Sequence, residues 1–317
     1  MWDVTFRPRT LVTAAAAIAF ALGTAGCSSS SNDPDAALDV LTSFYPLQFV
    51  AEQVGGPAVS VSNLTPPGGE PHSLELSPAT LRTVGQADVV VYQSGFQAAV
   101  DQAVADGAPK AVLDAARFAE LDADAEHDDE GESESHDGHD HGSLDPHFWL
   151  DPTLLAGLAT EVGETFAAAD PDDAAGYRER AAELVATLTD LDESFTTGLA
   201  SCDSRTFVTT HEAFGYLAHR YDLEQVGISG LDPETEPSPA RLREVSKVIS
   251  EAGVSTVFSE SAATAKVAEV LADDLGISTA VLDPLESRTD AQLAADDDYL
   301  VAMNANLTAL KEALGCA

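Results

Sequence analysis

The sequence predicts an α/β protein of two lobes, each a mostly parallel sheet flanked by helices, joined by one long rigid helix. Short apolar runs alternate with helical segments in both halves of the chain, which is the pattern of parallel sheets covered by helices. Between the two series, residues 171–199 carry apolar side chains at helical spacing. A length of 317 residues and a hydrophobic content of 44% suffice for two such lobes.

The first lobe is predicted at residues 38–170. Two of its helices begin where a capping side chain precedes proline, at Ser77-Pro78 and at Asp151-Pro152. Its strands are short and apolar, as in Asp-Val-Val-Val-Tyr at 88–92. The expected strands are 38–42, 59–64, 88–92 and 111–113, and the expected helices are 47–54, 78–85, 96–105 and 152–168.

The second lobe is predicted at residues 201–317, after a linking helix at 171–200. The expected strands are 206–209, 225–228, 256–259 and 279–282, and the expected helices are 214–221, 239–252, 263–275 and 297–314. Ligands of open α/β sheets bind beyond the carboxyl ends of the strands. The cleft between the two lobes is therefore the expected binding site.

Residues 1–26 have the organisation of a secretory signal peptide. Two arginines precede an apolar run at 11–22, which is shorter than the about 20 residues that a membrane span needs. The small residues that follow lead to Cys27, and this arrangement resembles a bacterial lipoprotein signal. The resemblance implies that Cys27 is lipidated and holds the protein on the outer face of the cytoplasmic membrane. The polar run that follows Cys27 predicts a flexible tether at 27–37. An ordinary cleaved signal is the alternative, and it too places the protein outside the cytoplasm.

Two further cysteines, Cys202 and Cys316, remain in this exported chain. Cysteines in oxidising compartments pair more often than they stay free, so a disulfide that anchors the C-terminus is predicted. Two buried free thiols are the alternative.

The charge of the chain excludes several partners. Only 15 lysines and arginines oppose 54 acidic residues, for a net charge of -39. Nucleic-acid binders gather basic residues on one face, so no nucleic-acid partner is expected. An anionic membrane surface would repel the protein, which leaves the lipid anchor as its predicted membrane contact.

An acidic, histidine-rich insert occupies residues 121–143. It contains ten acidic residues and four of the eight histidines in the chain: His127, His136, His139 and His141. Such a segment cannot bury apolar surface and is expected to be disordered. Its composition predicts weak capture of metal ions, with a plain solvated loop as the alternative.

Three other histidines and one aspartate lie where strand and helix meet. His72 follows the strand at 59–64, His147 precedes a helix, and His211 and Asp283 each come directly after a strand. The two lobes contribute two of these residues each. Three imidazoles and a carboxylate form the kind of four-coordinate site that suits zinc. His219 falls within a predicted helix and is expected to be structural or on the surface.

Several motifs around these residues carry a family resemblance: Pro71-His72-Ser73, the run Asp-Pro-His-Phe-Trp-Leu-Asp-Pro at 145–152, Thr210-His211-Glu212-Ala213-Phe214-Gly215-Tyr216, Gly227-Ile228-Ser229-Gly230-Leu231 and Asp283-Pro284-Leu285. Over about residues 38–316 the chain resembles the extracytoplasmic zinc-binding proteins of bacterial ABC-type metal importers. The resemblance implies two lobes bridged by a single long helix, limited closure on binding, and delivery of Zn²⁺ to a membrane permease. A metallochaperone is a further candidate partner, and a monomer is expected.

The resemblance also implies that His72, His147, His211 and Asp283 bind the metal, with Glu70 as an alternative fourth ligand. Manganese and iron relatives place a carboxylate where this chain has His211, and imidazole at that position favours zinc. A manganese or iron carrier and an adhesin-like surface protein remain alternatives. Because imidazole binds metal only when neutral, affinity is expected to fall as the pH drops through about 6.5.

A zinc hydrolase is the remaining alternative, with Glu70 or Glu212 as its general base. Such an enzyme needs an open coordination position at the metal. The chain contains neither a His-Glu-x-x-His run nor a Gly-x-Ser-x-Gly elbow. A binding protein without catalytic activity is therefore expected.

Overall fold

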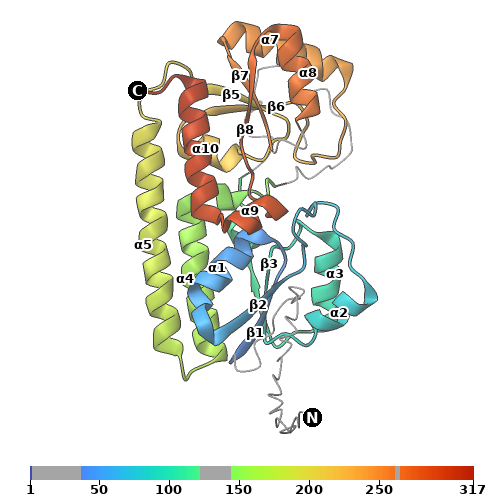
Figure 1. Ribbon diagram of the computed structural model, residues 1–317, viewed down its shortest axis with the longest axis vertical. Coiled ribbons are helices and arrows are strands. Elements are labelled where there is room, and N and C mark those ends of the chain that lie inside the picture. The colour runs from blue at the N-terminus through green and yellow to red at the C-terminus, as the bar shows by residue number, and fades with distance from the viewer. Residues whose placement is uncertain (2–36, 122–143, 261–264) are drawn as a thin grey trace, which may run out of the picture. The chain divides into compact units, whose positions relative to one another are not determined.

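The computed structural model describes residues 37–121, 144–260 and 265–317, together with Met1. Residues 32–317 belong to one compact unit. Within it lie two parallel sheets covered by helices, which confirms the predicted fold class (Figure 1). The predicted signal peptide, tether and insert fall almost wholly outside the described residues, and the exact lobe boundaries stay a prediction. None of the helices in the described ranges is long and apolar enough to span a membrane.

The N-terminal sheet has the strand order β2-β1-β3-β4, and every neighbouring pair is parallel. Strand β3 is the valine-rich run, and its alternate residues are buried on opposite faces of the sheet. Helix α2 begins as predicted, because Ser77 Oγ accepts a hydrogen bond from Thr80 N. The elements are β1 (Leu38–Thr42), α1 (Tyr45–Gly55), β2 (Val59–Asn63), α2 (Pro78–Val84), β3 (Val89–Tyr92), α3 (Ala98–Gly107) and β4 (Ala111–Asp114), with short 3-10 turns at Gly56–Ala58 and Ala115–Phe118.

Two long helices connect the sheets. Helix α4 (Pro152–Ala169) begins at the Asp151 cap, and α5 (Ala174–Gly198) follows after a short turn. Helix α5 packs against α1 and α4 and, near its far end, against α10 (Tyr299–Leu314) (Figure 1). It therefore contacts elements of both lobes, as the predicted linking helix requires, although it starts three residues later than expected.

The C-terminal sheet repeats the arrangement of the first one, with the order β6-β5-β7-β8 and parallel pairs throughout. Its helix α9 is absent from the sequence prediction and begins with a capping box formed by Thr289 and Gln292. The elements are β5 (Thr206–Thr209), α6 (Gly215–Arg220), β6 (Glu224–Gly227), α7 (Pro239–Ala252), β7 (Thr256–Ser259), α8 (Lys266–Leu275), β8 (Ser278–Val281), α9 (Asp290–Ala295) and α10.

A single apolar core extends through both lobes. It includes Val40 of β1, Trp149, Phe195 of α5, Phe258 of β7 and Tyr299 of α10, all buried. Two smaller cores cover the opposite faces of the two sheets, one under α2 and α3 and the other under α7 and α8. The lobes therefore share buried side chains as well as a connecting helix.

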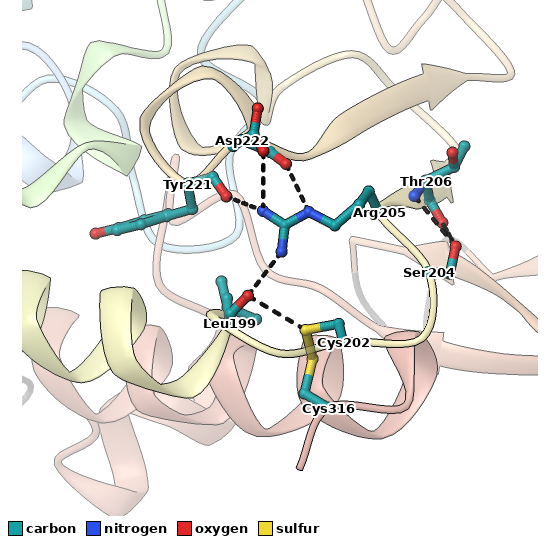
Figure 2. Close-up of a disulfide and its surroundings, with 8 residues drawn as sticks. All are labelled: Leu199, Cys202, Ser204, Arg205, Thr206, Tyr221, Asp222 and Cys316. Carbon is teal, nitrogen blue, oxygen red and sulfur yellow. Dashed lines mark hydrogen bonds and ion pairs between the residues drawn. A yellow bond between two sulfur atoms is a disulfide. The ribbon is translucent and has the colours of Figure 1, made fainter.

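The predicted disulfide between Cys202 and Cys316 is formed in the structure, across a sequence separation of 114 residues (Figure 2). It joins the chain just after α5 to the end of α10. Beside it, the Arg205 guanidinium donates to the carbonyls of Leu199, Tyr221 and Asp222. These contacts fix the C-terminus and the end of α5 to the second lobe.

Candidate metal centre

The candidate site is built from loops at the carboxyl ends of strands in both sheets. His72 lies in the loop between β2 and α2, and His147 comes just before a 3-10 turn, Phe148–Leu150, that leads into α4. His211 follows β5, and Glu286 follows β8. Since both sheets are parallel, all four loops lie at the edges where α/β proteins bind their ligands.

These four side chains converge on one point. Oxygen Oε1 of Glu286 lies 2.9 Å from His147 Nε2, 3.2 Å from His72 Nε2 and 3.8 Å from His211 Nε2. One ligand atom from each residue lies within 4.8 Å of all the others. In a tetrahedral zinc site with bonds of about 2.0–2.1 Å, ligand atoms are about 3.3 Å apart. Glu286 is already at about this spacing from His147 and His72, and the more distant ligand atoms need to approach one another by at most about 1.5 Å to coordinate such an ion.

Burial distinguishes the four side chains. The exposed fractions are 13% for His72, 6% for Glu286, 1% for His211 and 0% for His147. The site thus faces solvent mainly along His72 and is closed elsewhere. Nitrogen Nε2 of His211 is buried without a hydrogen-bond partner among the described residues. An unpaired imidazole nitrogen of this kind is costly unless a ligand satisfies it, and a metal ion would do so.

His147 is oriented by Asp145, two residues earlier in the chain. Oxygen Oδ1 of Asp145 lies 2.7 Å from His147 Nδ1 and also accepts a hydrogen bond from His147 N at 2.9 Å. Gly215 at the start of α6 permits this packing, since a Cβ there would lie 2.5 Å from Asp145 Oδ2. With Nδ1 held by the carboxylate, Nε2 is left to face Glu286.

Charge and burial oppose each other at His147 and Glu286. Burial alone would lower the pKa of His147, but the carboxylates of Asp145 and Glu286 outweigh it and raise that pKa to about 9. Burial alone would raise the pKa of Glu286, but hydrogen bonds from His147 and His72 lower it well below its usual range. Both shifts favour a protonated His147 facing an ionised Glu286 when no metal is bound.

The sequence prediction grouped Asp283 with the three histidines, and the structure brings Glu286 to them instead. Asp283 Oδ1 accepts from Leu285 N, and Oδ2 accepts from Gln292 Nε2. Leu285 adopts a left-handed conformation with φ of 59°, and the Asp283 bond helps to hold that unfavourable turn. The turn carries Glu286 to the three imidazoles. Asp283 is thus engaged in shaping the loop.

The loop after β8 is also held against the first lobe. Trp149 Nε1 donates to Pro284 O at 2.7 Å, and Gly68 N donates to Arg288 O at 2.8 Å. Tyr45 N lies 3.4 Å from Glu286 O. Glu286 is therefore fixed by contacts with the lobe that supplies His72 and His147.

The remaining predicted residues lie around the centre. Glu70 Oε1 accepts from His72 N at 3.0 Å, and its carboxylate is outside the converging group. Burial, together with the charges of Glu286 and Glu260, raises the pKa of Glu70. Glu212 points to Arg241 at 3.1 Å, and His219 is exposed on α6. The structure therefore favours Glu286 over Glu70 as the carboxylate of the site.

Cys27 and the four insert histidines, His127, His136, His139 and His141, lie outside the described residues. The described residues on either side of the insert, Leu121 and Asp145, lie close together. Asp145 N donates to Leu121 O at 3.1 Å, and Leu121 N donates to the Tyr216 hydroxyl at 2.8 Å. Both flanking segments therefore lie next to the turn that carries His147.

The chain is similar in sequence to proteins named for zinc binding and zinc uptake. Residues 40–313 match the family described as periplasmic zinc-uptake complex component A, ZnuA. The chain is 32% identical over 293 residues to the zinc-binding lipoprotein AdcA of Streptococcus pneumoniae, covering 90% of this chain and 57% of that protein. It thus spans little more than half the length of that relative. The high-affinity zinc uptake system protein ZnuA of Bacillus subtilis is also 32% identical, with 93% of each chain covered.

Solved structures show the same similarity. The Zn(II)-bound ZnuA-like domain of S. pneumoniae AdcA superposes with a TM-score of 0.72 at 32% identity, over 87% of this chain and 98% of that one. The laminin-binding protein Lmb of Streptococcus agalactiae, described as bifunctional in adhesion and metal transport, superposes with a TM-score of 0.74 at 31% identity, over 87% and 99%.

Proposed function

This chain belongs to the family of periplasmic zinc-uptake complex component A, and we propose that it binds one Zn²⁺ ion tightly and delivers it to an ABC-type importer. The observation that carries the proposal is the convergence of His72, His147, His211 and Glu286, with the buried Nε2 of His211 left for the ion. Relatives named for zinc binding and zinc uptake support the same assignment.

The donor set supports zinc over manganese or iron. Three imidazole nitrogens and one carboxylate oxygen suit a four-coordinate Zn²⁺ ion, whereas manganese prefers an oxygen-rich shell. His211 is the residue that separates these outcomes, since it supplies the third nitrogen. We therefore assign the cargo as Zn²⁺, held without a chemical reaction.

We place the protein outside the cytoplasmic membrane, anchored through lipidated Cys27 and the tether at 27–37 as a monomer. The signal-like N-terminus supports this location, as does the description of relatives as lipoproteins. The ABC-type permease is the proposed recipient of the ion, and a metallochaperone is a further candidate partner.

The insert at 121–143 is proposed to gather zinc weakly and pass it to the tight site. Its histidines, His127, His136, His139 and His141, stand among acidic residues that attract cations. The described residues that flank it, Leu121 and Asp145, lie beside the turn that carries His147, which supports a transfer of this kind.

Zinc titration of the wild type and of His211→Ala, read by competition with a chelator, tests the proposal. The wild type is expected to bind one equivalent tightly. His211→Ala is expected to lose that affinity by roughly 100-fold or more, because it removes the third nitrogen donor. A 100-fold loss corresponds to about 2.7 kcal/mol. An unchanged affinity in His211→Ala would contradict the ligand set.

The metal content of protein purified from medium containing zinc, manganese and iron tests the identity of the cargo. Predominance of manganese would overturn the assignment of zinc.

Adhesion is the second candidate function, and the similarity to Lmb favours it. It predicts saturable binding of the purified protein to immobilised laminin, compared with an albumin-coated surface. The two functions are tested independently of each other. The loss of tight zinc binding expected in the His211→Ala variant does not depend on whether the protein binds laminin.

A further inference from the structure

A second carboxylate, Glu260, contacts His211 on the side of the ring away from the centre. Oxygen Oε1 of Glu260 lies 3.0 Å from His211 Nδ1. The pair reproduces the contact between Asp145 and His147 on the other lobe, at 2.7 Å. Each of the two most buried imidazoles of the site therefore has its Nδ1 on a carboxylate and its Nε2 towards Glu286.

The sheet itself brings Glu260 to His211. Strands β5 and β7 are parallel neighbours, and their register pairs Thr209 with Phe258. A hydrogen bond from Thr210 N to Phe258 O, at 2.9 Å, continues this ladder. His211 and Glu260 each follow this pair by two residues, just beyond the ends of the two strands. The register of β5 and β7 therefore delivers both residues to the same end of the sheet, where the contact between Glu260 Oε1 and His211 Nδ1 forms.

Other contacts already fix the backbone at His211, so Glu260 acts on the tautomer and orientation of the imidazole ring. His211 O accepts from Thr209 Oγ1 at 2.7 Å and from Gln225 Nε2 at 3.1 Å. A neutral imidazole carries its proton on one of its two nitrogens. A carboxylate at Nδ1 favours the proton there, which leaves the lone pair of Nε2 directed at the centre.

We propose that Glu260 is a positioning residue that holds His211 in the tautomer and orientation needed for metal binding, and that it strengthens the nitrogen donor at the third ligand position. The proposal rests on the ligand set proposed above. Glu260 belongs to the same lobe as His211, and its side chain is 18% exposed. It therefore prepares the ring before the ion arrives, independently of contacts made by the first lobe.

Zinc affinities of Glu260→Ala and Glu260→Gln test the proposal. Loss of a carboxylate that orients a ligating histidine typically weakens metal binding about 10–100-fold, and this range is expected for Glu260→Ala. Glu260→Gln retains an oxygen that accepts from Nδ1 and should fall between Glu260→Ala and the wild type. Glu269→Gln is the matched control, because it removes one exposed negative charge of α8 in the same lobe. It should change affinity less than about 2-fold.

Two further readouts separate positioning from a general loss of structure. In a His211→Ala background, Glu260→Ala should cause no additional loss of zinc affinity, since its effect acts through the ring. Nitrogen-15 spectra of the metal-free protein should report His211 protonated at Nδ1 in the wild type and a mixture of tautomers in Glu260→Ala.

Wild-type zinc affinity in Glu260→Ala, or an equal loss with and without His211, would overturn the positioning role. If His211→Ala itself binds zinc like the wild type, the proposed ligand set fails instead. If His211→Ala loses tight binding and Glu260→Ala keeps it, only the role of Glu260 is refuted.

Discussion

Oxygen Oε1 of Glu286 lies 2.9 Å from Nε2 of His147, although 139 residues separate the two in the chain. The contact joins a loop of the second sheet to the turn that opens α4. It explains why a carboxylate is tolerated in a nearly closed site, since the imidazole supplies both a donor and, when protonated, a compensating charge.

Replacing Glu286 by glutamine should weaken zinc binding by roughly 100-fold or more, because the site loses the one carboxylate that converges with the imidazoles among the described residues. A charged contact of this kind contributes about 3 kcal/mol. Asp283→Asn is the matched control, since Asp283 shapes the loop without joining the cluster. Chelator competition measures both. Equal losses in the two variants would argue against Glu286 as the ligand.

Zinc affinity should continue to rise with pH above the usual histidine range. His147 has a pKa of about 9 in the metal-free protein, so zinc must displace its proton at lower pH. One displaced proton gives up to about a tenfold change per pH unit below that pKa. Calorimetry in buffers of different ionisation enthalpy should report about one proton released near pH 7.5. A constant affinity from about pH 7 to 9 would be inconsistent with this state of His147.

The same protonation affects the stability of the metal-free protein. The folded pKa of His147 lies above its unfolded value of about 6.5. Its contribution to the free energy of unfolding is therefore complete below about pH 6.5 and is lost as the pH rises through about 9. Urea unfolding across this range should show that decline, and Asp145→Asn should reduce it, because Asp145 is one of the charges that raise this pKa.

Removing the disulfide should destabilise the fold and spare the metal site. A double Cys202→Ala, Cys316→Ala variant is expected to lose about 2–5 kcal/mol of unfolding free energy, because the crosslink no longer restricts the unfolded chain. Urea unfolding of the metal-free protein measures the loss, and zinc titration should give the wild-type affinity. If the variant is fully folded but binds zinc more weakly than the wild type, the C-terminus also supports the site.

Replacing residues 122–143 by a short Gly-Ser linker should leave the tight site intact and remove weaker zinc equivalents. The replacement is geometrically feasible, because Leu121 O already accepts from Asp145 N at 3.1 Å. A variant with serine at His127, His136, His139 and His141 provides the control with unchanged length. Equilibrium dialysis counts the equivalents, and loss of the tight one would place the insert within the primary site.

The sequence was sufficient to predict that the three histidines come together, because each lies at the end of a strand or the start of a helix. Asp283 satisfied the same rule but lies outside the converging group, since the left-handed turn at Leu285 brings the carboxylate three residues further along, that of Glu286, to the imidazoles instead. That turn depends on contacts with Gln292 and Asn306, which no local pattern reveals. The acid that follows Asp-Pro-Leu was the available signal for Glu286.

Helix α9 and the contact of Glu260 with His211 were missed for different physical reasons. Helix α9 carried a readable Thr-x-x-Gln capping pattern, but it is short and none of its residues is buried, so no apolar period marks it. Glu260 could not be found from spacing, since its relation to His211 depends on which strands are neighbours. By contrast α5, with its long apolar stripe, was predicted within a few residues.

The apolar core that runs through both lobes has a thermodynamic consequence. Neither lobe can melt without exposing side chains that the other one buries, so the protein should show a single calorimetric transition. A bound ion then stabilises the entire molecule, by about 2.7 kcal/mol when free zinc exceeds the dissociation constant 100-fold. The melting temperature thereby becomes a gauge of site occupancy, and variants far apart in the sequence can be ranked on one scale.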